Sequence, residues 1–140
     1  MASTINASST ANGIVSTADA SGILNVQSNG VNTNAQAWVN FNGSTAAIRA
    51  SYNVSSITKN GTGDYTVNFT TAMPNANYAV NATTSNYGNG TTVGTIQIFQ
   101  QTTTQTQVAP TTSNFRFVTY NYNYTTVVDP TYVCVSVFSS

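Results

Sequence analysis

Apolar and polar side chains alternate with a period of two in several short segments of this chain, and turn residues separate these segments. Ala37, Val39 and Phe41 would share one face of a strand, and the same pattern recurs at residues 65–69 and 78–82. Residues 92–100, 115–124 and 131–138 predict further strands. The connections contain Asn-Gly, Gly-Asn-Gly and Asp-Pro sequences, which are typical of tight turns.

This pattern predicts an all-β domain over residues 36–140. We expect an antiparallel β-sandwich, a jelly-roll-like knob with about seven or eight strands. Residues 1–35 differ from the rest, because they are rich in Ser, Asn, Ala and Thr and contain no aromatic residue. Such a segment can hardly build a core of its own, so we expect an extended N-terminal arm that is ordered by contacts with other chains.

Charge is nearly absent. The 140 residues include 3 Lys or Arg, 3 Asp or Glu and no His, whereas ordinary domains contain about 25 % charged residues. Without clustered cations the chain is not expected to bind nucleic acid. No apolar run approaches the ~20 residues that cross a bilayer, so no membrane insertion is expected. The N-terminus has neither the basic start nor the apolar core of a signal peptide, which predicts synthesis in the cytoplasm.

The same composition removes most catalytic arrangements. Without His, one chain cannot form a Ser-His-Asp or Cys-His site, and we expect no catalytic residues, no metal site and no cofactor. Asp64 and Asp129 could in principle hydrolyse a glycoside, but both stand in turn sequences and are predicted to be structural. Lys59 is predicted to be a solvated hairpin lysine. Cys134, the single cysteine, is predicted to be a small buried hydrophobe.

Tyrosine and asparagine residues supply the candidate receptor-binding side chains. Tyr120, Tyr122 and Tyr124 would share one face of an extended segment, and Tyr87 and Asn89 lie at a predicted loop tip. Aromatic rings can stack on the C–H face of a sugar while amides bond its hydroxyls, and such anchors also suit protein recognition. The alternative is that the tyrosine stripe of residues 120–124 faces the core or a subunit interface.

Several stretches resemble a known family. AWVNFNG (residues 37–43) and AIRASYNVSSITKNGTGDYTVNFTTAMPNANYAV (residues 47–80) are similar to a domain near the C-termini of tail fibres and related virion proteins of tailed bacteriophages, including phages of cyanobacteria. TADASGILNVQSNG (residues 17–30) resembles segments that often precede that domain. DPTYVCVSVF (residues 129–138) is similar in style to its closing strand. Residues 84–128 match nothing specific.

The resemblance implies a virion surface location, an intertwined homotrimer and a structural role for Arg49, which could pair with Asp64 or with a neighbouring subunit. It implies a short trimeric fibre or spike that is attached to another virion protein through residues 1–35. Its knob would adhere to a host cell-surface glycan or protein.

Two other functions stay open. About 36 residues precede the knob. If the 140 residues are the whole protein, we expect no long shaft, and a capsid decoration or cement protein becomes the alternative to a short fibre. A polysaccharide depolymerase is the remaining class, in which carboxylates from different subunits would meet at an interface.

Overall fold

In a computed structural model of the chain, the described residues are 27–28, 31–32, 34–85, 95–99, 106–121 and 124–139. These residues form strands and no helix, so they contain no helix that is long and apolar enough to span a membrane. The strands are β1 (Gln27–Ser28), β2 (Val31–Asn32), β3 (Ala37–Phe41), β4 (Ile48–Tyr52), β5 (Val54–Gly61), β6 (Asp64–Phe69), β7 (Ala79–Thr84), β8 (Thr95–Ile98), β9 (Asn114–Tyr120) and β10 (Val133–Phe138).

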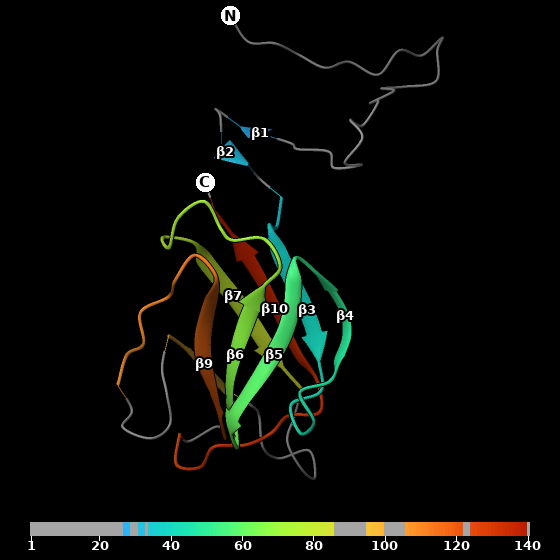
Figure 1. The fold of residues 1–140 in the computed structure, drawn as a ribbon. Helices are drawn as coiled ribbons and strands as arrows, with labels where there is room; N and C mark the ends of the chain where they lie inside the picture. Colours follow the sequence, from blue (N-terminus) through green and yellow to red (C-terminus); the bar gives the residue numbers. More distant parts are fainter. Residues whose placement is uncertain are drawn as a thin grey trace, which may run out of the picture.

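Two antiparallel sheets of four strands each form a sandwich (Figure 1). The strand orders are β4-β3-β10-β7 and β5-β6-β9-β8, and every pairing is antiparallel. The short strands β1 and β2 pair with each other in a separate two-stranded sheet. The predicted all-β class is confirmed. The expected arm of residues 1–35 lies mostly outside the described residues.

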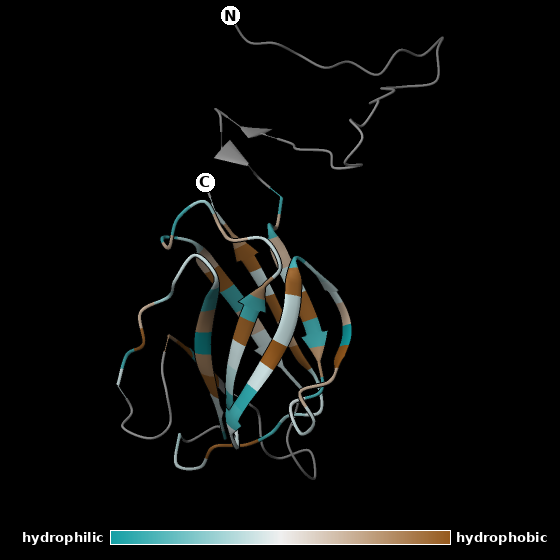
Figure 2. Ribbon diagram, viewed as in Figure 1, coloured by the Kyte–Doolittle hydropathy of each residue, from teal (hydrophilic) through white to brown (hydrophobic). Residues whose placement is uncertain are grey.

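The inner faces of both sheets supply the core. β3, β6 and β10 alternate buried and more exposed residues, because a period of two sends every second side chain to the same face. Figure 2 shows this as bands of contrasting hydropathy along the strands. Aromatic rings from both sheets meet edge to face, among them Phe41 against Tyr65 with 5.2 Å between ring centroids. Such pairs contribute about 0.5–1.5 kcal/mol each beyond the area that they bury.

The predicted core strands are confirmed for residues 37–41 and 65–69. Tyr78 is buried as expected, although its strand begins one residue later and Val80 and Ala82 are only partly buried. The segments at 92–100 and 131–138 contain β8 and β10. The sequence analysis did not predict β4 and β5.

The predicted strand over residues 115–124 is too long. β9 ends at Tyr120, because the side chain of Asn121 closes a turn. Its Oδ1 accepts hydrogen bonds from the backbone N–H of Thr125 (2.9 Å) and of Thr126 (3.1 Å). Tyr124 has a φ of 57°, which is incompatible with a continuing strand.

Asn53 carries the chain from one sheet to the other, between β4 and β5. Its φ is 54°, a left-handed conformation that Asn tolerates better than most residues. The side-chain amide donates to the carbonyl oxygens of Gln36 and Thr71, both at 3.1 Å, and its Oδ1 accepts from Thr71 N–H at 2.7 Å. These bonds fix the corner at which the chain leaves β4 and crosses to β5 in the opposite sheet.

The β5–β6 turn offers a matched pair of glycines for a stability test. Gly63 has a φ of +66°, and a Cβ there would lie 2.7 Å from the carbonyl oxygen of Thr119. A Cβ added at Gly61, the last residue of β5, would have open space around it. We expect Gly63→Ala to lower the free energy of unfolding by about 2 kcal/mol, because an L-residue is strained in this conformation. Gly61→Ala should change it by less than about 0.5 kcal/mol. Equal urea midpoints for the two variants would contradict this reading of the turn.

Candidate functional site on an outer sheet face

The outer face of the β4-β3-β10-β7 sheet gathers aromatic and polar side chains in rows across the strands. One row runs Tyr52, Trp38, Ser136 and Asn81, because these residues stand directly opposite one another in the strand register. The next row runs Ala50, Asn40, Cys134 and Thr83. Phe138 lies beyond Ser136 on the same side of β10. We call these rows, with Phe138, Arg49 and Tyr132, the aromatic face.

Large side chains on this face are exposed. The exposed fractions are 40 % for Trp38, 43 % for Tyr52 and 40 % for Phe138. Trp38 and Tyr52 are neighbours, since directly opposite residues of an antiparallel pair have Cβ atoms about 4.5–5.5 Å apart. Adjacent exposed rings on a regular sheet form a platform that can stack on a flat ligand.

Arg49 and Tyr132 extend the aromatic face at one end. The Arg49 guanidinium lies 4.1 Å from the centroid of the Tyr132 ring, in a cation–π contact. It donates one hydrogen bond to Asn40 Oδ1 (3.3 Å) and another to the carbonyl oxygen of Thr131 (2.8 Å). Of the two partners expected for Arg49, Asp64 binds Arg116 instead, and pairing with a neighbouring subunit stays a prediction.

The opposite sheet presents polar side chains that are already bonded to one another. Asn68 donates to the hydroxyls of Ser56 (3.1 Å) and Thr58 (3.0 Å), and Asn60 donates to Thr66 Oγ1 (3.0 Å). Part of their hydrogen-bonding capacity is therefore used within the sheet.

The polar groups of the aromatic face are arranged differently. Within the part of the chain that the structure describes, the indole N–H of Trp38, the hydroxyls of Tyr52 and Ser136 and the amide of Asn81 make no side-chain hydrogen bond. Exposed donors without an internal partner are available to a ligand or to water. Among the described residues, the aromatic face therefore combines exposed rings with donors that have no internal partner.

The predicted receptor-binding tyrosines do not form one exposed stripe. Tyr120 is 5 % exposed, which agrees with the alternative that this position faces the interior. Tyr124 is 54 % exposed, and its ring centroid lies 6.2 Å from that of Tyr120. Tyr87, Asn89 and Tyr122 lie outside the described residues. Trp38 and Tyr52 were not predicted as surface aromatics, although the alternation with buried Ala37 and Val39 places Trp38 on the outer side.

Two single-residue predictions are corrected by the structure. Cys134 is exposed rather than buried, because Val133, Val135 and Val137 take the inward positions of β10. Lys59 is not a freely solvated lysine, because its ammonium donates to Asp129 Oδ2 (2.6 Å) and to the carbonyl oxygen of Ser44 (2.8 Å).

Both described carboxylates serve structural networks. Asp64 is fully buried and receives two bonds from the Arg116 guanidinium, at 2.7 and 2.8 Å, and this hydrogen bonding raises the pKa of Arg116. Asp129 accepts from Lys59, from the Tyr65 hydroxyl (2.6 Å) and from Gly63 N–H (2.7 Å). Burial, followed by the Asp129 bond, raises the pKa of Tyr65 well above its usual range. No group of three metal-ligating side chains occurs among the described residues.

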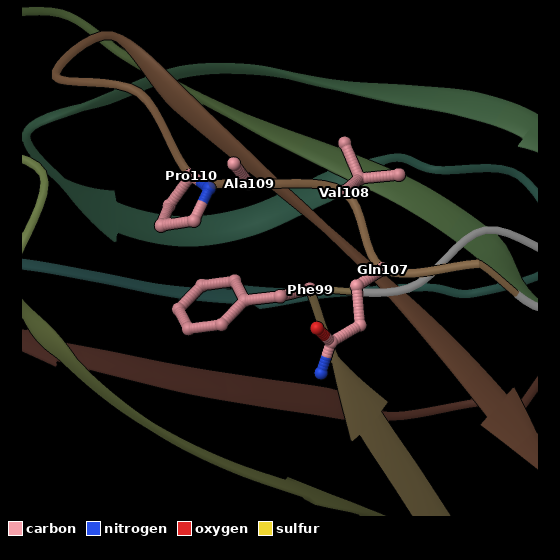
Figure 3. A pocket seen from close by; sticks show the side chains of 5 residues that line it. All are labelled: Phe99, Gln107, Val108, Ala109 and Pro110. Atoms are coloured by element: carbon pink, nitrogen blue, oxygen red, sulfur yellow. The ribbon is translucent and has the colours of Figure 1, made fainter.

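A cavity of about 470 Å³ lies at the end of β8 (Figure 3). Its described lining is Phe99, Gln107, Val108, Ala109 and Pro110. The segment 107–110 is tied to Phe99 by a hydrogen bond from Val108 N–H to the Phe99 carbonyl oxygen, at 2.7 Å. These five residues offer apolar contact and one amide, and none of them is a titratable or nucleophilic group.

No family model, curated protein or solved structure matches the chain. The function is therefore inferred from the geometry of the aromatic face.

Proposed function

We propose that this chain is a structural protein of a bacteriophage virion surface, a short trimeric fibre or spike whose β knob adheres to a host receptor glycan. The knob would be a jelly-roll-like sandwich within an intertwined homotrimer, and residues 1–35 would attach it to another virion protein. The observation that carries the adhesive role is the exposed Trp38–Tyr52 pair, which lies beside donors that have no internal partner.

The chemistry of the aromatic face supports a sugar ligand. A pyranose has apolar C–H faces, which suit the exposed rings, and a rim of hydroxyls, which suit amide and hydroxyl side chains such as Asn81 and Ser136. A flat sheet face gives shallow contacts and modest affinity per subunit. Three copies on one fibre would raise the overall avidity by roughly 10²–10⁴-fold.

The two described carboxylates support a role without catalysis. Each is held in an ion pair with a cation of the same sandwich, Asp64 with Arg116 and Asp129 with Lys59. A glycosidase needs one carboxyl as acid and a second as base or nucleophile beside the scissile bond. Incubation of the protein with host polysaccharide should therefore release no reducing ends.

The second candidate is a capsid decoration or cement protein. The exposed rings of Trp38, Tyr52 and Phe138 favour it, because protein interfaces are rich in aromatic side chains. Immunogold labelling of virions separates the two proposals: gold at the tail supports the fibre, and gold over the head supports decoration.

The adhesive role predicts that Trp38→Ala weakens binding of the full-length protein to host cells by about 30-fold or more, as for hot-spot aromatics at other interfaces. Tyr124→Ala is the comparison variant, since Tyr124 is at least as exposed but lies outside the aromatic face. It should weaken binding only if the residues proposed from the sequence also contact the receptor. Titration of fluorescent protein against host cells measures both affinities, and circular dichroism verifies that both variants are folded.

Two results would overturn this proposal. One is wild-type cell binding by a folded Trp38→Ala variant. The other is a change in its sedimentation coefficient, which would identify the aromatic face as a subunit interface.

A further inference from the structure

We infer that the glycan bound at the aromatic face is acidic, and that Arg49 binds its anionic substituent while Trp38 and Tyr52 stack on the sugar rings. This inference rests on the proposed adhesive function and names the ligand class of the same site. The juxtaposition behind it is a guanidinium that none of the described carboxylates pairs with, at the end of an exposed aromatic platform.

Charge balance singles out Arg49. The chain has three cationic residues, and two of them are neutralised by carboxylates: Lys59 by Asp129 at 2.6 Å and Arg116 by Asp64 at 2.7 Å. Within the described residues Arg49 makes no ion pair, and neither described carboxylate lies on the aromatic face. Among the described residues, the charge of Arg49 on this face is therefore not compensated by a carboxylate. An anionic ligand complements it.

The guanidinium is both held in place and available. The bonds to Asn40 and to the Thr131 carbonyl oxygen use two of its five N–H donors, and the Tyr132 ring covers one of its faces. The remaining donors lie on an exposed side chain. A guanidinium fixed in this way loses little conformational freedom on binding, and its planar fork matches the two oxygens of a carboxylate.

The spacing suits one extended ligand. Arg49 contacts Asn40, which is two residues from Trp38 on the same face of β3. Two residues along a strand span about 7 Å. The cation and the stacking platform are therefore close enough for one oligosaccharide to reach both, with its ring on Trp38 and an acidic group at Arg49.

The test is an array of acidic oligosaccharides, each printed beside a neutral counterpart. It contains oligogalacturonate, oligoglucuronate, oligomannuronate and sialyl oligosaccharides, with their methyl-esterified or carboxyl-reduced forms. A sulfated glycan and its desulfated form distinguish sulfate from carboxylate as the source of the charge. We expect the full-length protein to bind at least one acidic form about tenfold more tightly than its neutral counterpart. The preference should shrink as salt rises.

Variants of Arg49 test whether the preference for acidic glycans arises at the aromatic face. Arg49→Gln should bind the acidic and neutral forms alike, whereas Arg49→Lys should keep part of the preference because it keeps the charge but loses the planar fork. Trp38→Ala should weaken binding to both forms of a pair.

The failures of the two proposals are distinguishable. Trp38-dependent binding with equal affinity for the acidic and neutral forms overturns the acidic-ligand inference and leaves the adhesive function standing. An acidic preference that persists in Arg49→Gln also overturns the inference. Absence of Trp38-dependent binding to every printed glycan overturns the glycan-binding function itself, and the inference falls with it.

Discussion

Arg116→Met is expected to lower the free energy of unfolding by about 3–5 kcal/mol at neutral pH, because it leaves the Asp64 carboxylate buried without its cation. Asp64 has no exposed surface, and both of its oxygens accept from the Arg116 guanidinium. After the substitution, the carboxylate would keep the hydrogen bond from the Asn60 amide at 3.2 Å. A neutral amide donor is a weaker partner than a bidentate guanidinium.

Two control variants distinguish the effect of an unpaired buried charge on stability from the effect of losing an arginine side chain. Arg49→Met removes an exposed guanidinium and should cost less than about 1 kcal/mol. Asp64→Asn combined with Arg116→Met removes both charges, so this double variant should be more stable than Arg116→Met alone. Urea unfolding at pH 7 measures all three. If Arg116→Met lost no more stability than Arg49→Met, the ion pair would have no net stabilising role.

The aromatic core was predictable because period-two alternation depends only on local sequence. Residues 37–41 and 65–69 show it cleanly, since each strand buries one face against the opposite sheet. β4 and β5 have no such signal. Both are edge strands whose residues are mostly exposed, and their burial does not alternate regularly. Edge strands with weak patterning are therefore recognised only once their partners are known.

The charged pairs could not be predicted, because they depend on strand order. Arg116 and Asp64 are 52 residues apart in sequence and meet only because β9 pairs with β6. Lys59 and Asp129 are 70 residues apart, so the sequence around Lys59 suggests only a solvated lysine.

The candidate site was missed for a related reason. The alternation in β3 places Trp38 on the face opposite the buried Val39 side chain. That Tyr52 lies beside Trp38 is shown only by the register of the β3–β4 pair. Arg49 reaches the same face through a β-bulge between Asn40 and Phe41. The surface emphasised by the sequence, residues 120–124, is divided by the turn at Asn121.

Asp129→Asn is expected to lower the free energy of unfolding at pH 7 by about 2–4 kcal/mol, because charge-assisted hydrogen bonds are lost. The carboxylate joins three segments: Lys59 of β5, Gly63 in the β5–β6 turn and Tyr65 of β6. An amide keeps one acceptor oxygen, but its NH₂ group would face the Lys59 ammonium or another donor. Tyr65→Phe removes only one of these bonds and should cost less.

The same network predicts a dependence on pH. Burial alone would raise the pKa of Asp129, but the hydrogen bonds from Lys59, Tyr65 and Gly63 N–H outweigh it, and the pKa lies below its ordinary value of 3.8. The unfolded chain therefore binds the proton first as the pH falls. The stabilisation from this carboxylate is complete above about pH 4 and is lost as the pH drops through the folded-state pKa.

Urea unfolding of the wild type and of Asp129→Asn between pH 7 and pH 2 measures this contribution. The difference in free energy of unfolding should be constant from pH 7 to about pH 5 and should narrow below about pH 4, because only the wild type has the carboxylate to protonate. A difference that stays constant down to pH 2 would show that Asp129 is not the group responsible. A difference that widens on acidification would mean that the folded-state pKa lies above the unfolded value, which is the opposite of what the three hydrogen bonds require.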